Sequence, residues 1–592
     1  MTYRTHMGGS LRAQEEGERV TVAGWVARRR DHGGLVFVDV RDQAGLVQLV
    51  FNPDERPEAH AASHALRTEF VIRAAGVVRR RAPETVNPKL ETGEIEIHVD
   101  TVEVLNTAPV LPFQLDDDGV DETLRLRHRY LDLRRDAMRR NLWVRFKLTQ
   151  TIRRFLEERD FWELETPLLY KSTPEGAREF LVPTSSHPGR FYALPQSPQT
   201  YKQLYVIAGY ERYYQIARCF RDEATRADRT AEFTQLDLEM AFLEPDELHA
   251  LMEGLFQAVW RDVLGEDLET PFPRLTHAEA MLRYGSDKPE TRFGCEIADV
   301  TDALRGTEFK AFRGVIDAGG VVRGFAVPGA LDYSRKDFEG LVDFAKAWGG
   351  KGVAWLQLDG GEVRSPIAKF LSPAEIEAIT GGVGAGDGDT VLLVADAEDS
   401  AVRVLGPLRL HLGERLRLIG DGWNFVWVTE FPMFEWLHDE QRWKAGHNPF
   451  SAPAPADVDD FEARPAEAIA RQYDLVLNGN EIGGGSIRNH RADVQMRVFR
   501  MLGMSDEEAE EKFSFLLRAL RMGAPPHGGI AFGIDRLAML LARAESLRDV
   551  TAFPKGQGGA DPLTGAPTPA PDADLRQYGI RVVAEPAGDA KV

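Results

Sequence analysis

One pair of expected strands carries residues that suit the binding of a nucleotide. The first ends at Phe220–Glu223, and a polar loop leads to the second, Phe233–Glu239. Because side chains alternate along a strand, Phe233 and Gln235 share a face with two acids, opposite the leucines. Arg221 could grip a phosphate while Phe233 stacks on a base. A solvated outer sheet face is the alternative interpretation.

A glycine-punctuated strand that runs into an apolar helix, His527–Leu540, is a second candidate. Small residues let a nucleotide approach the backbone, and Arg536 lies in the first turn of the helix. A cation there would add to the free N–H groups that phosphate finds at a helix N-terminus. The alternative is an ordinary strand–helix corner with a surface arginine.

Three consecutive glycines, Gly483–Gly485, lie between two acids and an arginine, namely Asp474, Glu481 and Arg488. Glycines weaken a strand, so the triplet needs a reason, such as the close approach of a ligand. The two acids could hold Mg²⁺ on a triphosphate, because this ion takes one or two carboxylates together with phosphate oxygens and waters. A flexible glycine-rich turn with incidental charges is the alternative.

The N-terminal region presents a different chemistry. In Leu35–Arg41 the valines share one face and leave Phe37 on the polar face, and Gln48 points away from the apolar residues of the next strand. Arg28–Arg30 lie just upstream. Barrels hold single-stranded bases by such stacking and edge hydrogen bonds, each stack contributing ~1–3 kcal/mol. The alternative is that Phe37 closes one end of the barrel core and the arginines form a solvated edge.

The elements that position these residues require several domains, because 592 residues exceed what one core needs. Short alternating strands predict a five-stranded barrel at the N-terminus. A Pro- and Asp-rich linker follows, and a glycine-rich stretch indicates a domain inserted into the second one. The fold class is α+β multidomain. The predicted boundaries are 1–108 for the barrel, 109–124 for the linker, 125–289 and 421–555 for the second domain, 290–420 for the insertion, and 556–592 for a C-terminal extension.

Composition and missing motifs exclude several classes of protein. With 43% hydrophobic and 28% charged residues, the chain is an ordinary globular protein whose apolar runs are shorter than the ~20 residues of a membrane helix. Two cysteines and no signal-type N-terminus predict a cytoplasmic protein with no membrane contact. The net charge of −21 argues against diffuse binding of nucleic acid, so we expect local contacts and no DNA. P-loop, dinucleotide-binding and common zinc motifs are missing.

Together these runs resemble motifs 1, 2 and 3 of the class II aminoacyl-tRNA synthetases, most closely the bacterial aspartate-specific members. Motif 1 corresponds to the helix and strand of residues 142–167, which end at Pro167, motif 2 to Phe220–Glu239 and motif 3 to Gly528–Leu541. Thr173–Arg178 resembles the mobile active-site loop of that family. Ala193–Gln199, followed by Lys202, resembles a further family run, and the resemblance covers essentially the whole chain.

The resemblance implies an OB-fold anticodon-binding barrel, a catalytic domain on an antiparallel sheet, and the insertion typical of bacterial members. It implies an enzyme that uses ATP and Mg²⁺ to convert L-aspartate to aspartyl-adenylate and then charges the 3′ end of tRNA(Asp). Charging of tRNA(Asn) stays open, because His32 stands where aspartate-specific relatives often have leucine. Family members are homodimers through motif 1.

The resemblance also assigns roles to residues. Arg221 and Arg536 would clamp the phosphates of ATP, Phe233 would stack on adenine and Glu223 would contact the adenine edge, with Asp474 and Glu481 on Mg²⁺. Arg488 and Lys202 would meet the side-chain carboxylate of aspartate, braced by Asp237. The other implied aspartate contacts are Glu175, Ser197, Gln199, Gln235 and His447. The implied anticodon contacts are Arg28, Arg30, His32, Phe37, Gln48, Arg79 and Glu94.

The implied specificity agrees with physical chemistry. Asparagine is nearly isosteric with aspartate, so the size of the pocket cannot select one over the other. Selection must come from buried cations, which aspartate pairs with and asparagine leaves unpaired. One departure is that Asn448 follows His447, where the family usually has a second histidine, so the role of this position is open.

Alternative functions are an asparaginyl- or lysyl-type synthetase, or a non-catalytic tRNA-binding relative. Arg488 and Lys202 disfavour the first two. The intact set of Arg221, Glu481 and Arg536 disfavours the third.

Overall fold

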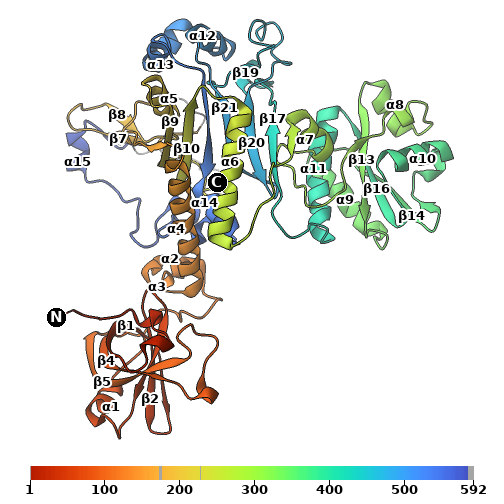
Figure 1. Ribbon diagram of the computed structural model, residues 1–592. Helices are drawn as coiled ribbons and strands as arrows, with labels where there is room; N and C mark the ends of the chain where they lie inside the picture. Colours follow the sequence, from red (N-terminus) through yellow and green to blue (C-terminus); the bar gives the residue numbers. More distant parts are fainter. Residues whose placement is uncertain (1, 173–176, 227–228, 584–592) are drawn as a thin grey trace. The chain divides into compact units, whose positions relative to one another are not determined.

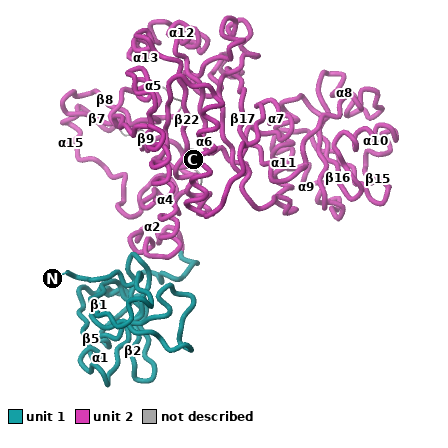
Figure 2. The backbone as a smooth tube through the Cα atoms, in the orientation of Figure 1, with its two compact units in different colours: residues 1–120 teal, residues 121–592 magenta. Residues whose placement is uncertain are grey.

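The computed structural model describes residues 2–172, 177–226 and 229–583. The chain forms two compact units, residues 1–120 and residues 121–592 (Figure 2). Within the described ranges, no helix is both long and apolar enough to cross a membrane.

The first unit is a closed five-stranded barrel with strand order β1-β2-β3-β5-β4. The valines of β2 are buried in its core while Phe37 is half-buried on the other face, as the alternation predicts. The predicted five-stranded barrel is therefore confirmed. Its elements are β1 (Arg19–His32), β2 (Leu35–Arg41), β3 (Leu46–Phe51), α1 (Pro57–Ser63), β4 (Val71–Arg80) and β5 (Ile95–Asn106).

The second unit is built on an eight-stranded sheet with strand order β11-β17-β20-β21-β22-β10-β9-β6. Its neighbouring strands are antiparallel except at the two edges, where β11 pairs with β17 and β6 with β9 in parallel. The strands are β6 (Trp162–Glu163), β9 (Arg212–Phe220), β10 (Glu232–Ala241), β11 (Arg274–Thr276), β17 (Phe425–Thr429), β20 (Gln472–Leu477), β21 (Asn480–Ile487) and β22 (His527–Gly533).

Three helices cover one face of this sheet: α4 (Asp136–Glu157), α6 (Pro245–Leu264) and α14 (Ile534–Ala542) (Figure 1). Residues at helical spacing on α4, such as Leu148, Ile152 and Phe155, are buried against the sheet, as their periodicity predicts. Leu236 and Leu238 of β10 belong to the same core. The opposite face of the sheet is therefore left for polar chemistry.

The strand predicted after α4 is shorter than expected. Only Trp162–Glu163 pairs with β9, although Leu164 N still donates to Tyr214 O at 3.1 Å. This strand lies at the sheet edge, and Pro167 has no N–H with which to extend the pairing.

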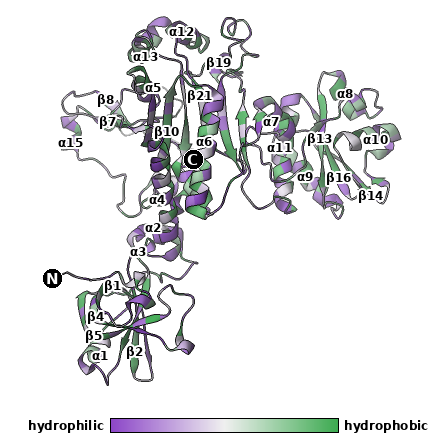
Figure 3. Cartoon of the chain, in the orientation of Figure 1, coloured by the Kyte–Doolittle hydropathy of each residue, from purple (hydrophilic) through white to green (hydrophobic). Residues whose placement is uncertain are grey.

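Residues 298–396 contain a second sheet, inside the predicted insertion. Its five strands are antiparallel in the order β12-β13-β16-β14-β15, with helices on both faces. Leu392 and Val394 pack toward α9 and α11, whereas Val391 and Leu393 pack toward α8 and α10. Both faces of β16 are thus buried, and Figure 3 shows β13 and β16 as largely hydrophobic. The elements are β12 (Ala298–Asp299), α8 (Lys310–Asp317), β13 (Val321–Pro328), α9 (Arg335–Ala347), β14 (Ala354–Asp359), β15 (Glu362–Arg364), α10 (Pro373–Gly382), β16 (Asp389–Asp396) and α11 (Glu398–Arg415).

Smaller elements complete the second unit. The tail reaches the turn between β7 and β8, where Gly189 N donates to Tyr578 O at 2.9 Å. The remaining elements are α2 (Glu122–Arg127), α3 (Arg129–Asp132), β7 (Leu181–Pro183), β8 (Phe191–Ala193), α5 (Gln199–Ile207), α7 (His277–Tyr284), β18 (Phe434–Leu437), β19 (Arg442–Ala445), α12 (Ala492–Met501), α13 (Asp506–Leu520) and α15 (Asp572–Gln577).

Candidate active site

The predicted nucleotide-binding and substrate-binding residues converge on the sheet face that α4, α6 and α14 leave uncovered. They come from β20, β21 and β10, from residues directly after β9 and β21, from the first turn of α14, and from α5 beside the sheet. On β10 the leucines point into the core, so Asp237 and Glu239 necessarily point to the other face. The solvated outer face considered above is wrong for this strand, because both acids are buried.

Two cations and two anions form a buried network in this face. Lys202 Nζ lies 3.1 Å from Asp237 Oδ1 and 3.3 Å from Glu239 Oε2. Arg488 Nε donates to Glu239 Oε1 at 3.0 Å. None of the four side chains is more than 2% exposed. Since an unpaired buried charge is costly, the network holds each of them in a fixed place.

The arginine of this network retains binding capacity. A guanidinium has five N–H donors. Glu239 accepts from Nε and from Nη2, and Ser486 Oγ accepts from Nη1 at 2.8 Å. Two donors of Arg488 therefore have no partner among the described residues, which is the number that a second carboxylate would take.

The two acids of the network respond differently to burial. Burial raises the pKa of Asp237 despite its contact with Lys202. Burial acts in the same direction on Glu239, but Arg488 and Lys202 outweigh it and lower the pKa of that carboxyl group. Glu239 is thus the firmly ionised member of the pair.

A basic and aromatic pair lies where β9 ends and β10 begins. The guanidinium of Arg221 is 5.0 Å from the ring centroid of Phe233, and Arg221 N donates to Ala231 O at 2.8 Å. In the described part of the chain no group hydrogen-bonds Arg221 Nε, although this atom is buried. Glu223 follows in the same loop and pairs with Arg229 at 2.9 Å.

Two carboxylates and a second arginine lie on the neighbouring strands. Arg536 Nη1 donates to the backbone oxygen of Glu481 at 2.8 Å. Asp474 is buried, and burial together with the nearby charge of Glu481 raises the pKa of Asp474 well above its usual value. Two acids that repel each other in this way suit a divalent cation.

The glycine triplet lies in strand β21 and not in a flexible turn, so that alternative is wrong. A Cβ atom on Gly484 would come within 2.4 Å of Asp474 Oδ1, and one on Gly485 within 2.0 Å of Gly529 O. Glycine is needed because the strands and the acid approach so closely.

His447 links the two halves of the site. The surrounding protein shields the imidazole from water and thereby lowers the pKa of His447 to about 4. The cations Arg488, Arg221 and Lys202 lower this pKa further, whereas Glu481 raises it. The imidazole is therefore within electrostatic range of charged groups from both halves of the site. The next residue, Asn448, accepts from Phe450 N at 2.9 Å, so its side chain stabilises the local turn.

The remaining predicted aspartate contacts lie at the start of α5 and on β10. Gln199 N donates to Ser197 Oγ at 3.3 Å, and Gln199 Nε2 is buried without a hydrogen-bond partner among the described residues. Gln235 Oε1 accepts from Cys219 Sγ at 3.3 Å. Glu175 lies outside the described residues.

The barrel gathers most of its predicted contacts on one face. Arg30 pairs in register with Phe37 and donates to both oxygens of Asp39 at 3.0 Å. Gln48 is opposite Asp39 on β3 and donates to it at 3.4 Å. Arg28 pairs in register with Asp39 and is exposed. The polar face is therefore occupied by side chains already held in place.

The other barrel residues lie at its turns. His32 is exposed at the end of β1, and Arg79 near the end of β4 forms an ion pair with Glu55 at 3.0 Å. Glu94 is exposed beside a hollow of about 360 Å³ that is lined by the segment between β4 and β5 together with Arg12 and Ala13.

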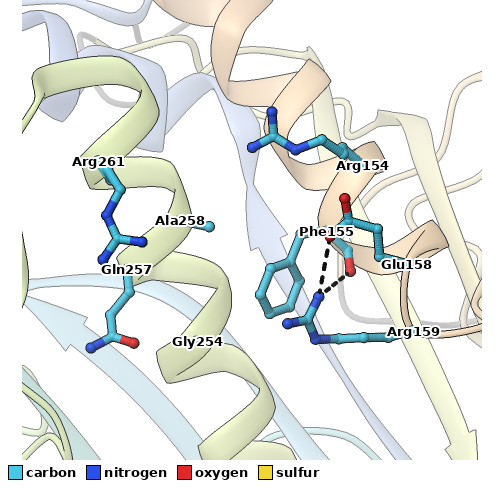
Figure 4. A pocket seen from close by; sticks show the side chains of 8 residues that line it. All are labelled: Arg154, Phe155, Glu158, Arg159, Gly254, Gln257, Ala258 and Arg261. Atoms are coloured by element: carbon cyan, nitrogen blue, oxygen red, sulfur yellow. Dashed lines mark hydrogen bonds and ion pairs between the residues drawn. The ribbon is translucent and has the colours of Figure 1, made fainter.

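A second hollow, of about 300 Å³, lies between α4 and α6 (Figure 4). It is on the helix-covered side of the sheet, away from the predicted site. Its arginines already have acidic partners: Arg154 pairs with Asp262, and Arg261 with Asp267 at 2.9 Å. No function is assigned to it.

Two residues of the site have no role in the sequence prediction. Alternation along the strand puts Glu239 on the face of Asp237, but it does not show that Glu239 pairs with both cations. Lys288, whose Nζ is 3.0 Å from Glu481 Oε2, comes from a distant segment with no recognisable pattern. Only the fold brings it to the site.

The chain belongs to the family "tRNA synthetases class II (D, K and N)", whose model matches residues 121–557, and residues 20–105 match the "OB-fold nucleic acid binding domain". Its relatives include two proteins named "Aspartate--tRNA(Asp/Asn) ligase". The one from Moorella thermoacetica is 50% identical over 584 residues, covering 98% of this chain and 97% of the relative. The one from Salinispora arenicola is 50% identical over 595 residues, covering 99% and 97%.

A solved structure with a related fold is the asparaginyl-tRNA synthetase of Pyrococcus horikoshii complexed with asparaginyl-adenylate. It has a TM-score of 0.60 at 19% identity and covers 93% of this chain and 98% of that chain. The likeness shows a shared fold. The predicted fold, a barrel followed by an antiparallel-sheet synthetase domain, is confirmed.

Proposed function

We propose that this enzyme activates L-aspartate with ATP and transfers the aspartyl group to tRNA(Asp), and that it also charges tRNA(Asn). The observation that carries the amino-acid assignment is the buried network of Lys202, Asp237, Glu239 and Arg488, in which two donors of Arg488 have no partner among the described residues. The names of the relatives support the assignment of the two tRNAs.

In the first step, the α-carboxylate of aspartate attacks the α-phosphorus of ATP and expels pyrophosphate. Arg221 stabilises the charge that develops on the α-phosphate, and Phe233, 5.0 Å from its guanidinium, stacks on adenine. Arg536 binds the far end of the triphosphate, and Glu223 contacts the adenine edge. In the second step, the ribose hydroxyl at the 3′ end of the tRNA attacks the adenylate. No protein nucleophile is required.

Specificity for an acid over its amide follows from charge. Asparagine has nearly the same shape as aspartate, but it would leave the free donors of Arg488 facing an amide NH₂ group. Lys202 adds a second cation, while His447, neutral because its pKa is lowered, contributes no further charge. Ser197, Gln199 and Gln235 contact the ammonium and α-carboxylate groups, and Glu175 is assigned to the same role from the sequence.

Asp474 and Glu481 would hold Mg²⁺, and their mutual repulsion is the observation that fits such an ion. When bound, Mg²⁺ neutralises charge on the triphosphate. The two carboxylates would hold the ion, and Arg536, which is fixed by its hydrogen bond to the Glu481 backbone oxygen, would bind the phosphates.

The decisive experiment is amino-acid-dependent exchange of pyrophosphate into ATP, measured with aspartate, asparagine and lysine. We expect exchange with aspartate and less than about 1% of that rate with the other two, because a site built for charge rejects the uncharged analogue by large factors. Comparable exchange with asparagine or lysine would favour those synthetases, and no exchange at all would favour a tRNA-binding protein without catalysis.

We further propose that the enzyme is a homodimer through α4 and β6. Trp143 and Phe146 on α4 are 47% and 55% exposed, and Trp162 on β6 is 61% exposed. Exposed aromatic residues gathered on adjoining elements are typical of a protein interface. Sedimentation equilibrium tests this, because a single species at the monomer mass would contradict it.

A further inference from the structure

A short segment after α7 reaches the phosphate side of the site. Glu290 fixes the local turn of this segment, because its buried carboxylate accepts from Arg292 N at 2.9 Å and from Arg292 Nε at 3.0 Å. Gly479, in the turn between β20 and β21, lies so close that an added Cβ would be 3.3 Å from Glu290 Cβ. The segment is therefore packed against the hairpin that carries Asp474 and Glu481.

Lys288 lies in this anchored segment and contacts the site directly. Its Nζ is 3.0 Å from Glu481 Oε2, with the two side chains 43% and 31% exposed. Lys288 N donates to Ser286 Oγ at 3.0 Å, which fixes the backbone from which the side chain extends. Asp287 and Arg536 also act electrostatically on Lys288. The ammonium thus joins Arg536 in one group of cations around Glu481.

The contact poses a conflict with the role proposed for Glu481. A divalent cation on this carboxylate would share it with an ammonium group that lies 3.0 Å from Glu481 Oε2, and two positive charges on one carboxylate repel each other. The long, flexible lysine side chain can move its charge by several ångströms, because it rotates about four bonds. The triphosphate that arrives with the cation offers oxygens for it, and lysine is a common ligand of phosphate.

We propose that Lys288 is an ATP-binding residue with two positions. Before the nucleotide arrives its ammonium group pairs with Glu481, and when Mg²⁺ and ATP bind the side chain swings away from this carboxylate and pairs with the terminal phosphates. This inference rests on the proposed function, since it assumes that Asp474 and Glu481 hold the cation of ATP. With Arg221 on the α-phosphate and Arg536 beside Glu481, Lys288 supplies the charge that stabilises the departing pyrophosphate.

The proposal predicts effects of opposite sign on two binding equilibria. In Lys288→Met, which keeps the length and loses the charge, Mn²⁺ should bind the nucleotide-free enzyme about two- to fivefold more tightly, because no ammonium competes for Glu481. ATP should bind at least about tenfold more weakly, as expected for the loss of one charge-assisted hydrogen bond. Electron paramagnetic resonance of free Mn²⁺ and isothermal titration calorimetry of ATP measure these two constants.

Two variants serve as controls. Lys288→Arg keeps a cation and should retain ATP affinity within about threefold, since both side chains bind phosphate. Lys351→Met removes a lysine from an ion pair of similar length, 2.9 Å to Asp396, in the insertion sheet, and should change neither constant. If Lys288→Met is poorly soluble, Lys288→Gln replaces it.

The outcomes separate this proposal from the function on which it rests. Wild type without aspartate-dependent pyrophosphate exchange would overturn the proposed function, whatever the variants do. Active wild type with unchanged ATP affinity in Lys288→Met would overturn the role of Lys288 alone. Parallel weakening of Mn²⁺ and ATP would also overturn it, because that result indicates a merely structural role.

Discussion

Arg488 and Glu239 form an ion pair in which both side chains are buried, with Arg488 Nε donating to Glu239 Oε1 at 3.0 Å. Gly529 makes room for this pair, because a Cβ atom there would lie 2.1 Å from Glu239 Oε2. The carboxylate holds one side of the guanidinium and leaves the rest for a ligand. A buried pair contributes little to stability on balance, so its value here is orientation.

The first prediction concerns Glu239→Gln, which keeps the shape and removes the charge. Arg488 and Lys202 would lose their shared counter-ion, which leaves Lys202 with Asp237 and Arg488 with Ser486 and holds both cations less firmly toward the substrate. We expect the KM for aspartate to rise at least about tenfold, the effect of losing about 1.4 kcal/mol of binding, while the KM for ATP changes less than twofold. Steady-state pyrophosphate exchange measures both constants.

Glu253→Gln is the matched control for this change. Glu253 is also buried, on α6, where it accepts from Trp427 Nε1 at 3.1 Å, away from the polar face of the sheet. The Glu253→Gln variant should leave the KM for aspartate unchanged. If Glu239→Gln also leaves this KM unchanged, or lowers it, Glu239 does not position the cations.

The second prediction concerns the phosphate-binding arginines. Arg221→Ala and Arg536→Ala should each lower the rate of aspartate activation by at least ~10²-fold, the effect of one preorganised electrostatic contact. Arg221 should act chiefly on kcat, because it stabilises charge that develops in the transition state. Pre-steady-state formation of the adenylate gives the rates. A near-normal rate in either variant would remove that arginine from the mechanism.

Much of this site could be predicted from the sequence because alternation along a strand is local. The face shared by Phe233, Gln235 and Asp237 follows from spacing alone. Two features could not be predicted in this way. Lys288 approaches Glu481 only through the packing of two segments almost 200 residues apart, and the length of β6 depends on which backbone groups find partners at a sheet edge. Both are tertiary effects with no local sequence signal.

The third prediction concerns stability in acid. His249 is buried on α6 with its ring 4.2 Å from that of Trp427, and no described residue hydrogen-bonds either ring nitrogen. Burial lowers the pKa of His249 to about 4. Between this pKa and the pKa of ~6.5 in the unfolded chain, the unfolded state binds more protons than the folded state. The contribution of neutral His249 to the free energy of unfolding is therefore fully present above this window and is lost as the pH falls through it.

The variant His249→Phe keeps an aromatic ring and removes the titration. From pH 7 to pH 5 the wild type should lose about 2 kcal/mol more of unfolding free energy than the variant, given the difference between the two pKa values. Urea denaturation at both pH values measures this. Equal losses in the two proteins would mean that His249 does not titrate as its burial implies.

The last prediction concerns the choice of tRNA. His32 is exposed at the end of β1, directly before Gly33 and Gly34, whose positive φ angles of 62° and 84° turn the chain into β2. An imidazole at this tip can donate or accept a hydrogen bond at a base edge, whereas leucine offers only apolar contact.

We therefore expect wild type to charge both tRNA(Asp) and tRNA(Asn). His32→Leu should lower kcat/KM for tRNA(Asn) about tenfold relative to tRNA(Asp), as expected for one base contact. The two tRNAs serve as controls for each other, because a general defect of the barrel would lower both. Wild type that ignores tRNA(Asn) would restrict the enzyme to tRNA(Asp) and leave His32 without a role in selecting between the two.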